Sequence, residues 1–233
     1  KKVLSIVLVL AAIVILAAGC GSKQTTPNTG NNQASNTATN TEFKLGDLSD
    51  SKPLVVNKEK KEVQVLAEVN GKYFTEPTRH GVVAKTGSNG EKSILRALAN
   101  EIDFYNALIE IGAQPGNNIT MADMKKSEKS VEGSKLNVFV TWEGLGKEIP
   151  FSDILKATED RPMDVRFGGN LENAKDKKTG CILCLDSCAV GITSNAAFKA
   201  NELEGKKQVQ ITGNSEVLPK DGTKVAVIFR LAD

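Results

Sequence analysis

Three cysteines lie within eight residues in the C-terminal quarter of the chain: Cys181, Cys184 and Cys188. Thiolates are soft donors, and proteins use them to hold iron–sulfur clusters, zinc and other thiophilic metals. The C-x-x-C-x-x-x-C spacing presents three ligands from one short segment, although it departs from the C-x-x-C-x-x-C run of bacterial ferredoxins. We therefore predict a cofactor at these residues, either a 4Fe-4S cluster or another thiophilic metal.

A fourth ligand must come from another residue type, because the remaining cysteine, Cys20, lies far away near the N-terminus. His80, the only histidine, is the first candidate, and Asp186 within the cysteine run is the second. A zinc site of three cysteines and one histidine is equally consistent with this set. The plainer interpretations are that His80 is a polar residue at the start of a strand and that Asp186 belongs to a turn.

The same run also fits a β-hairpin in which Cys184 and Cys188 face each other across a three-residue turn. Facing Cα atoms of antiparallel strands lie about 4.5–5.5 Å apart, within the range of about 4.4–6.8 Å that a disulfide spans. In a straight hairpin Cys181 and Cys184 point to opposite faces, which disfavours a shared metal. Only a bend at Ile182-Leu183 brings the three sulfurs together, so this bend separates a metal site from a structural disulfide.

The N-terminus has the pattern of an export signal. Lys1 and Lys2 precede an apolar run of sixteen residues, Val3 to Ala18, which is short for a membrane span of roughly 20 residues. The following Gly19-Cys20 resembles the lipobox of bacterial lipoproteins. This resemblance implies a signal peptide over residues 1–19, a lipid on Cys20, and a protein anchored on the extracytoplasmic face of the cell membrane. Residues 20–42 are almost wholly polar and are predicted to form a disordered tether.

Charge and motifs exclude several function classes. Once Lys1 and Lys2 are removed with the signal, 28 of the 30 basic residues remain against 28 acidic ones, so nothing favours nucleic-acid binding. There is no G-x-S-x-G motif and no phosphate-binding loop, and no enzyme is predicted. The paired lysines stand in place of the twin arginines of folded export, so a cluster would have to be assembled outside the cell.

The remaining residues, 43–233, are of a size typical of one domain. Apolar residues alternate with polar ones in segments 63–69 and 136–142, and segment 225–231 is a mainly apolar run; all three are predicted to be strands. Apolar residues recur at three- and four-residue spacing from Ile94 to Ile111 and predict the main helical segment, ending at Gly112. The expected fold is α+β, with a mainly antiparallel sheet.

Several segments resemble the YdjY-type domain family of bacterial lipoproteins, over most of the stretch from Tyr73 to Leu231. The resemblance is carried by the cysteine run and by four further segments: PTRHGVV (77–83), ALIEIGAQPG (107–116), VFVTW (138–142) and DVRFGGN (164–170). Members are commonly described as ferredoxin-like or 4Fe-4S proteins. The resemblance thus implies a domain, a location and a cofactor, but no reaction.

Two hypotheses follow. The first is a membrane-anchored lipoprotein whose cysteines hold an iron–sulfur cluster or another metal and pass electrons to a redox partner protein at the membrane. The alternative is a non-enzymatic extracytoplasmic binding or scaffold domain with a structural Cys184–Cys188 disulfide. In both, the membrane lipid is reached through Cys20.

Overall fold

The structure is a computed structural model that describes residues 44–205 and 208–233. The predicted signal peptide, Cys20 and the tether lie outside the described residues. The helices are α1 (Glu101–Glu110), α2 (Leu171–Lys177) and α3 (Glu202–Gly205). The strands are β1 (Lys44–Leu45), β2 (Leu48–Ser49), β3 (Leu54–Asn57), β4 (Glu62–Val69), β5 (His80–Ala84), β6 (Ser93–Ala97), β7 (Lys135–Trp142), β8 (Ile149–Pro150), β9 (Leu155–Ala157), β10 (Val165–Phe167), β11 (Cys181–Cys184), β12 (Thr193–Asn195), β13 (Ile211–Gly213) and β14 (Lys224–Leu231).

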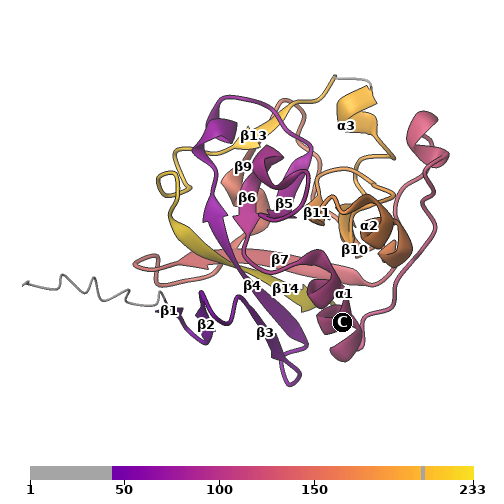
Figure 1. Cartoon of the computed structure of the whole chain (residues 1–233). Helices are drawn as coiled ribbons and strands as arrows, with labels where there is room; N and C mark the ends of the chain where they lie inside the picture. The colour runs from indigo at the N-terminus through magenta and orange to yellow at the C-terminus, as the bar shows by residue number, and fades with distance from the viewer. Residues whose placement is uncertain (1–43, 206–207) are drawn as a thin grey trace, which may run out of the picture. The chain divides into compact units, whose positions relative to one another are not determined.

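Eight strands form a closed barrel. Their order is β10-β12-β11-β5-β6-β4-β14-β7, and the ring closes because β7 also pairs with β10, with Leu136 opposite Val165. β3 and β8 add to the outside of this ring, on β4 and β7. The predicted α+β fold is therefore wrong: the described residues form a closed barrel with three short helices (Figure 1). Alternation identifies single strands but not their partners, so it does not reveal that the last strand of a sheet meets the first.

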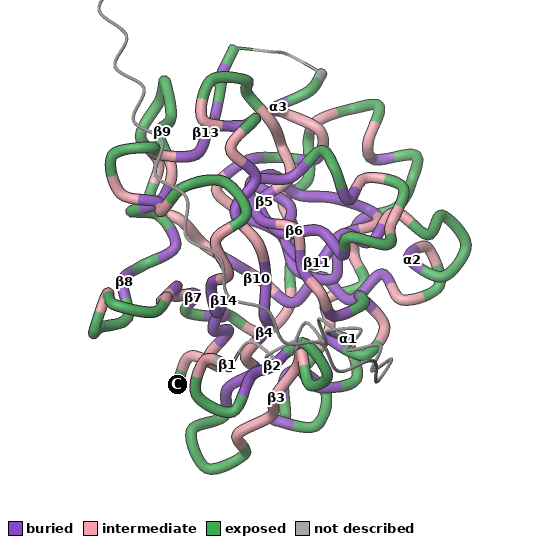
Figure 2. Tube along the Cα trace, turned by 60° about the vertical axis from the view of Figure 1, so that its left-hand side comes forward, coloured by how far each residue is buried: buried purple, intermediate pink, exposed green. Residues whose placement is uncertain are grey.

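The strands predicted at 63–69, 136–142 and 225–231 are confirmed as β4, β7 and β14, which lie side by side with β14 in the middle. Their alternate apolar side chains, such as Val65 and Val227, belong to the main core. Helix α1 adds Phe104, whose ring meets that of Phe229 at 4.6 Å between centroids. Figure 2 shows that β5, β6 and β11 are also largely buried, and these strands carry the candidate site.

The predicted helical segment is half wrong. Residues 93–97 form β6, which lies between β5 and β4, and only Glu101–Glu110 is helical. Asn100 separates the two because its side-chain oxygen caps α1 by accepting from the backbone N–H groups of Ile102 and Asp103. The apolar spacing of 94–98 suits a helix locally, but pairing with two neighbouring strands decides its conformation. None of the described helices has the length and apolar character needed to cross a membrane.

Candidate metal centre

A double irregularity in the barrel wall sets the directions of the cysteine side chains. Strand β11 pairs with β5 through Cys181↔Val83, Leu183↔Val82 and Cys184↔His80, with a register shift after each of the first two pairs. The first shift inserts Ile182 as an extra residue in β11, and the second inserts Gly81 as an extra residue in β5. One inserted residue reverses the alternation of side chains beyond it. Residues three apart in β11 therefore point to the same face.

The division of β11 between two clusters confirms this effect. Ile182 and Leu183 belong to the main core, whereas Cys181 and Cys184 pack with Val83 in a separate cluster. The bend that sequence reasoning required at Ile182-Leu183 is thus present. The glycine that permits it lies on the neighbouring strand: a Cβ on Gly81 would meet the carbonyl oxygen of Leu183 at 3.3 Å and a side-chain carbon of Leu185 at 3.0 Å.

This face brings together His80, Cys181 and Cys184, a group that could hold a metal ion. One ligand atom from each residue, an imidazole nitrogen and two sulfurs, lies within 4.8 Å of the other two. His80 Nδ1 is 3.9 Å from Cys181 Sγ, and the Asn89 amide donates to the same sulfur at 3.9 Å. Both cysteines are fully buried, so water does not reach the sulfurs. His80 was the first candidate for a non-cysteine ligand, and its imidazole lies close enough to Cys181 and Cys184 to share a metal with them.

Cys188 lies in the same cluster as Cys181 and Cys184, although it is not among the three residues of the close group. Cys184, Cys181 and Cys188 are free thiols, so the described residues contain no Cys184–Cys188 disulfide. The predicted hairpin is also wrong. β12 runs parallel to β11, with Cys184 opposite Ser194, and residues 185–192 form the connection between them.

Side-chain amides from α2 and its N-cap hold that connection in place. Asn170 donates to the backbone oxygens of Cys188 and Gly191, and Asn173 donates to that of Ala189. Asn170 itself adopts a left-handed conformation at φ +53°, which asparagine tolerates better than most residues. These bonds explain why 185–192 folds back across the barrel wall instead of making a tight turn.

Asp186, the second predicted fourth ligand, has a different role. Its carboxylate is buried and forms an ion pair with Arg79 at 2.6 Å, and it also accepts from the backbone N–H of Leu203. Burial raises the pKa of Asp186 to about 6, although Arg79 opposes this shift. Asp186 is thus engaged by arginine and lies outside the close group. Arg79 was not among the residues predicted for the site, although it directly precedes His80 in the segment PTRHGVV (77–83).

The three thiols differ in acidity because Cys184 lies between the other two. A hydrogen bond with Cys184 lowers the pKa of Cys181, and His80 adds to this shift. A hydrogen bond with Cys184 also lowers the pKa of Cys188, with a further contribution from the charge of Arg79. Those same bonds, together with burial, raise the pKa of Cys184. The arrangement thus favours a thiolate at Cys181 over one at Cys184, and a thiolate is the form that binds metals.

A buried hydroxyl group with no hydrogen-bonding partner among the described residues lies beside these sulfurs. Ser194 is fully buried, and its Oγ accepts from and donates to no described group. A Cβ on Gly191 would meet Ser194 Oγ at 2.9 Å and Cys184 Sγ at 2.8 Å, so both atoms border this glycine although they form no hydrogen bond with each other. A thiolate or metal-bound sulfur at Cys184 is an acceptor that this hydroxyl otherwise lacks.

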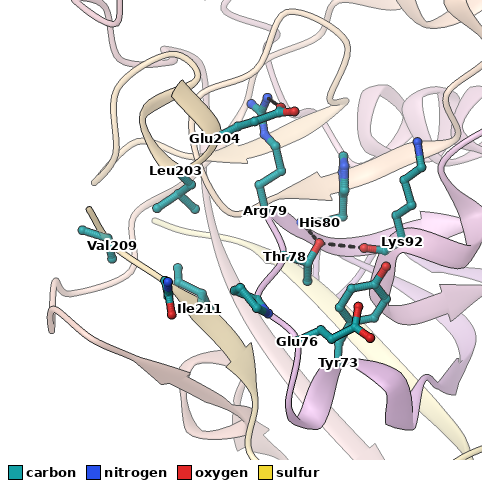
Figure 3. Close-up of a pocket in the computed structure, with 12 residues that line it drawn as sticks. Tyr73, Glu76, Thr78, Arg79, His80, Lys92, Leu203, Glu204, Val209 and Ile211 are labelled. Carbon is teal, nitrogen blue, oxygen red and sulfur yellow. Dashed lines mark hydrogen bonds and ion pairs between the residues drawn. The ribbon is translucent and has the colours of Figure 1, made fainter. Parts of the chain in front are cut away.

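His80 also borders an open pocket of about 420 Å³. Figure 3 shows His80 and Lys92 on one side of this pocket and Leu203, Val209 and Ile211 on another. Arg79 borders it as well and forms an ion pair with Glu204 at 3.0 Å. His80 thus borders the pocket and also belongs to the group with the buried sulfurs.

Fold and site together define a β-barrel protein with a buried sulfur–imidazole group on its wall. The chain belongs to the YdjY domain family, because the model of the YdjY domain matches residues 54–230. It is 42% identical over 224 residues to the uncharacterized protein YdjY of Escherichia coli (strain K12), and the alignment covers 96% of this chain and 95% of that protein. The family predicted from the sequence is therefore confirmed. No solved structure matches the chain significantly.

Proposed function

We propose that this protein binds a thiophilic metal through His80, Cys181 and Cys184 and acts as a redox protein. The convergence of one imidazole nitrogen and two buried sulfurs carries the proposal. Thiolate and imidazole ligands suit zinc, copper and iron, while magnesium and calcium prefer oxygen. Because the sulfurs are shielded from water, the site suits electron transfer better than a reaction on a bound substrate.

A single ion is the simplest occupant. Metal–sulfur bonds of about 2.3 Å in a tetrahedral site hold two sulfurs about 3.8 Å apart, which is compatible with a group whose ligand atoms lie within 4.8 Å. A 4Fe-4S cluster is the second form of the proposal. It takes a separate ligand on each iron, so it requires Cys188 in addition to the close group.

We further propose that the protein is a lipoprotein anchored through Cys20 on the extracytoplasmic side of the membrane, where it exchanges electrons with a membrane-associated partner protein. The proposal rests on the basic residues, the apolar run and the small residues before Cys20 in the sequence. An exposed position outside the cytoplasm favours oxidation of thiols. Burial of the three cysteines, and occupation by a metal, would protect them from it.

The test is metal analysis of the full chain, purified without oxygen, together with its absorption spectrum. We expect about one metal ion per chain, which is lost when Cys181→Ser and Cys184→Ser are introduced separately. The Cys188→Ser variant separates the two forms, because a single ion persists in it whereas a cluster does not. Iron and sulfide in equal amounts identify the cluster.

The result that contradicts this proposal is equally specific. Protein that takes up no metal, and in which mass spectrometry finds a Cys184–Cys188 disulfide, would be a binding or scaffold domain with structural cysteines.

A further inference from the structure

The metal ligand His80 lacks an outer hydrogen-bonding partner. Its Nδ1 faces Cys181, so a metal held there binds Nδ1 and the ring proton must lie on Nε2. Metal-binding histidines almost always donate this second N–H to a carboxylate, a carbonyl or water. Among the described residues, the imidazole ring makes no hydrogen bond other than that with Cys181. The acceptor expected for Nε2–H is therefore not supplied by the described part of the chain.

The open pocket lies against His80 and is bordered by an exposed cation that forms no ion pair among the described residues. Lys92 borders the pocket, and its ammonium group donates to the neutral side chain of Asn89 at 3.0 Å, with no ion pair among the described residues. The other charged residues of the pocket all form ion pairs, and Arg79 faces two carboxylates. Arg79 pairs with Asp186 and Glu204, and Glu76 pairs with Lys72. An ammonium group without an ion pair and an imidazole N–H on the same pocket can both donate hydrogen bonds to an anion.

The opposite side of the pocket is apolar. Leu203, Val209 and Ile211 line it, and Tyr73 contributes an aromatic ring near Lys92 (Figure 3). A volume of about 420 Å³ is within the range of small-molecule sites, which combine an apolar wall with a few polar groups. An inorganic anion would leave this apolar wall unused.

We propose that the pocket binds a small organic carboxylate, which accepts hydrogen bonds from His80 and Lys92 and packs its apolar part against Leu203, Val209 and Ile211. The proposal rests on the metal-binding function above. Because the carboxylate accepts a hydrogen bond from Nε2–H of His80, it orients the imidazole ring and directs Nδ1 towards the metal. Carboxylate and metal therefore strengthen each other's binding, and this coupling is reciprocal.

The experiment measures the affinity of the full chain for Co²⁺, a coloured substitute for other divalent metals, in a metal buffer with and without benzoate. We expect benzoate to tighten Co²⁺ binding about tenfold, as outer-shell partners of metal ligands do. Benzyl alcohol, of similar size but neutral, should have no effect. Lys92→Met should abolish the effect of benzoate while Co²⁺ still binds. The control is Lys175→Met, which changes an exposed lysine of α2 outside the pocket and should leave the effect of benzoate unchanged.

Failure of this inference is distinguishable from failure of the metal proposal. Co²⁺ that binds equally well with and without benzoate, or benzyl alcohol that is as effective as benzoate, overturns the inference and leaves the metal proposal intact. If Co²⁺ does not bind at all, the metal proposal fails. Benzoate binding to the metal-free protein is then followed by NMR, and absence of shifts at Lys92 and His80 overturns the pocket assignment as well.

Discussion

Ser194 illustrates how a single buried atom distinguishes the metal-free from the metal-bound protein. Its hydroxyl has no partner among the described residues and, like Cys184 Sγ, borders Gly191. An unsatisfied buried hydroxyl destabilises a folded protein by about 1–3 kcal/mol, whereas a thiolate that accepts from it turns the hydroxyl into a stabilising group. The same side chain is thus unfavourable without a metal and favourable with one.

Ser194→Ala should therefore have opposite effects on the two forms. In the metal-free protein we expect the free energy of unfolding to rise by about 1 kcal/mol, because the unpartnered hydroxyl is removed. Metal affinity should fall about tenfold, and the sulfur-to-metal absorption band should shift. Denaturant unfolding and a metal titration measure the two effects.

Ser187→Ala is the matched control. Ser187 is equally buried, but its Oγ donates to the carbonyl of Phe198 at 2.7 Å and accepts from the N–H of Val131 at 2.8 Å. This variant should lower the stability of both forms by about 1–3 kcal/mol. If Ser194→Ala also lowers the stability of both forms, the Ser194 hydroxyl has a structural partner and does not donate to the sulfur of Cys184.

At the scale of secondary structure, the site depends on the paired irregularities of β5 and β11. Without them Cys181 and Cys184 would point to opposite faces of the barrel wall, and His80 would meet only one of them. Gly81 permits the close approach of the strands, because any side chain there is crowded by Leu183 and Leu185. Metal binding should therefore be sensitive to this glycine although it contributes no ligand.

Gly81→Val should lower the free energy of unfolding by about 1–3 kcal/mol through overpacking, and it should also abolish metal binding. Unfolding curves and metal analysis of the folded protein provide the two measurements. Gly213→Val in β13 is the control. A Cβ there meets side chains of Phe74, Ile94 and Leu218 at 3.2–3.3 Å, so crowding is comparable but away from β11. A Gly81→Val protein that binds metal normally would show that the irregularity is not required.

At the scale of the molecule, the barrel gives the site a rigid and shielded position. Its wall supplies β5 and β11, and the segment before β7 covers the cysteines with Met124, whose sulfur accepts from the N–H of Ala189 at 3.4 Å. The proposed lipid on Cys20 would hold this domain at the membrane, where a redox partner is reached by motion in two dimensions. The metal-binding proposal and the lipoprotein proposal are independent, since neither requires the other.

Cys20→Ala should release the protein from the membrane fraction of cells, because the diacyl anchor is then lost and stable anchoring needs two acyl chains. Cell fractionation and the mass of the mature N-terminus provide the measurement. Cys184→Ser should remain in the membrane fraction, since it leaves the anchor unchanged. Wild-type protein that is recovered in soluble form with an unmodified Cys20 would contradict the lipoprotein proposal.

Part of the fold and of the candidate site is encoded in short stretches of the sequence. The spacing of the three cysteines, the alternation in β4 and β7, the apolar run of β14 and the helical pattern of 101–110 depend on neighbouring residues and are visible in the sequence. The same holds for the family, which was recognised from short segments. His80 was a predictable ligand because it is the only histidine in the chain.

Long-range pairing decided the rest. Closure of the barrel through β7 and β10, the strand conformation of 93–97, and the parallel arrangement of β11 and β12 all depend on partners distant in sequence. His80 and Cys181 are 101 positions apart, and they meet only because Gly81 and Ile182 shift the register between their strands. Sequence by itself determined which residues could bind a metal. Tertiary structure alone decided which of them point to the same place, because side-chain direction in a strand follows its register with a neighbour.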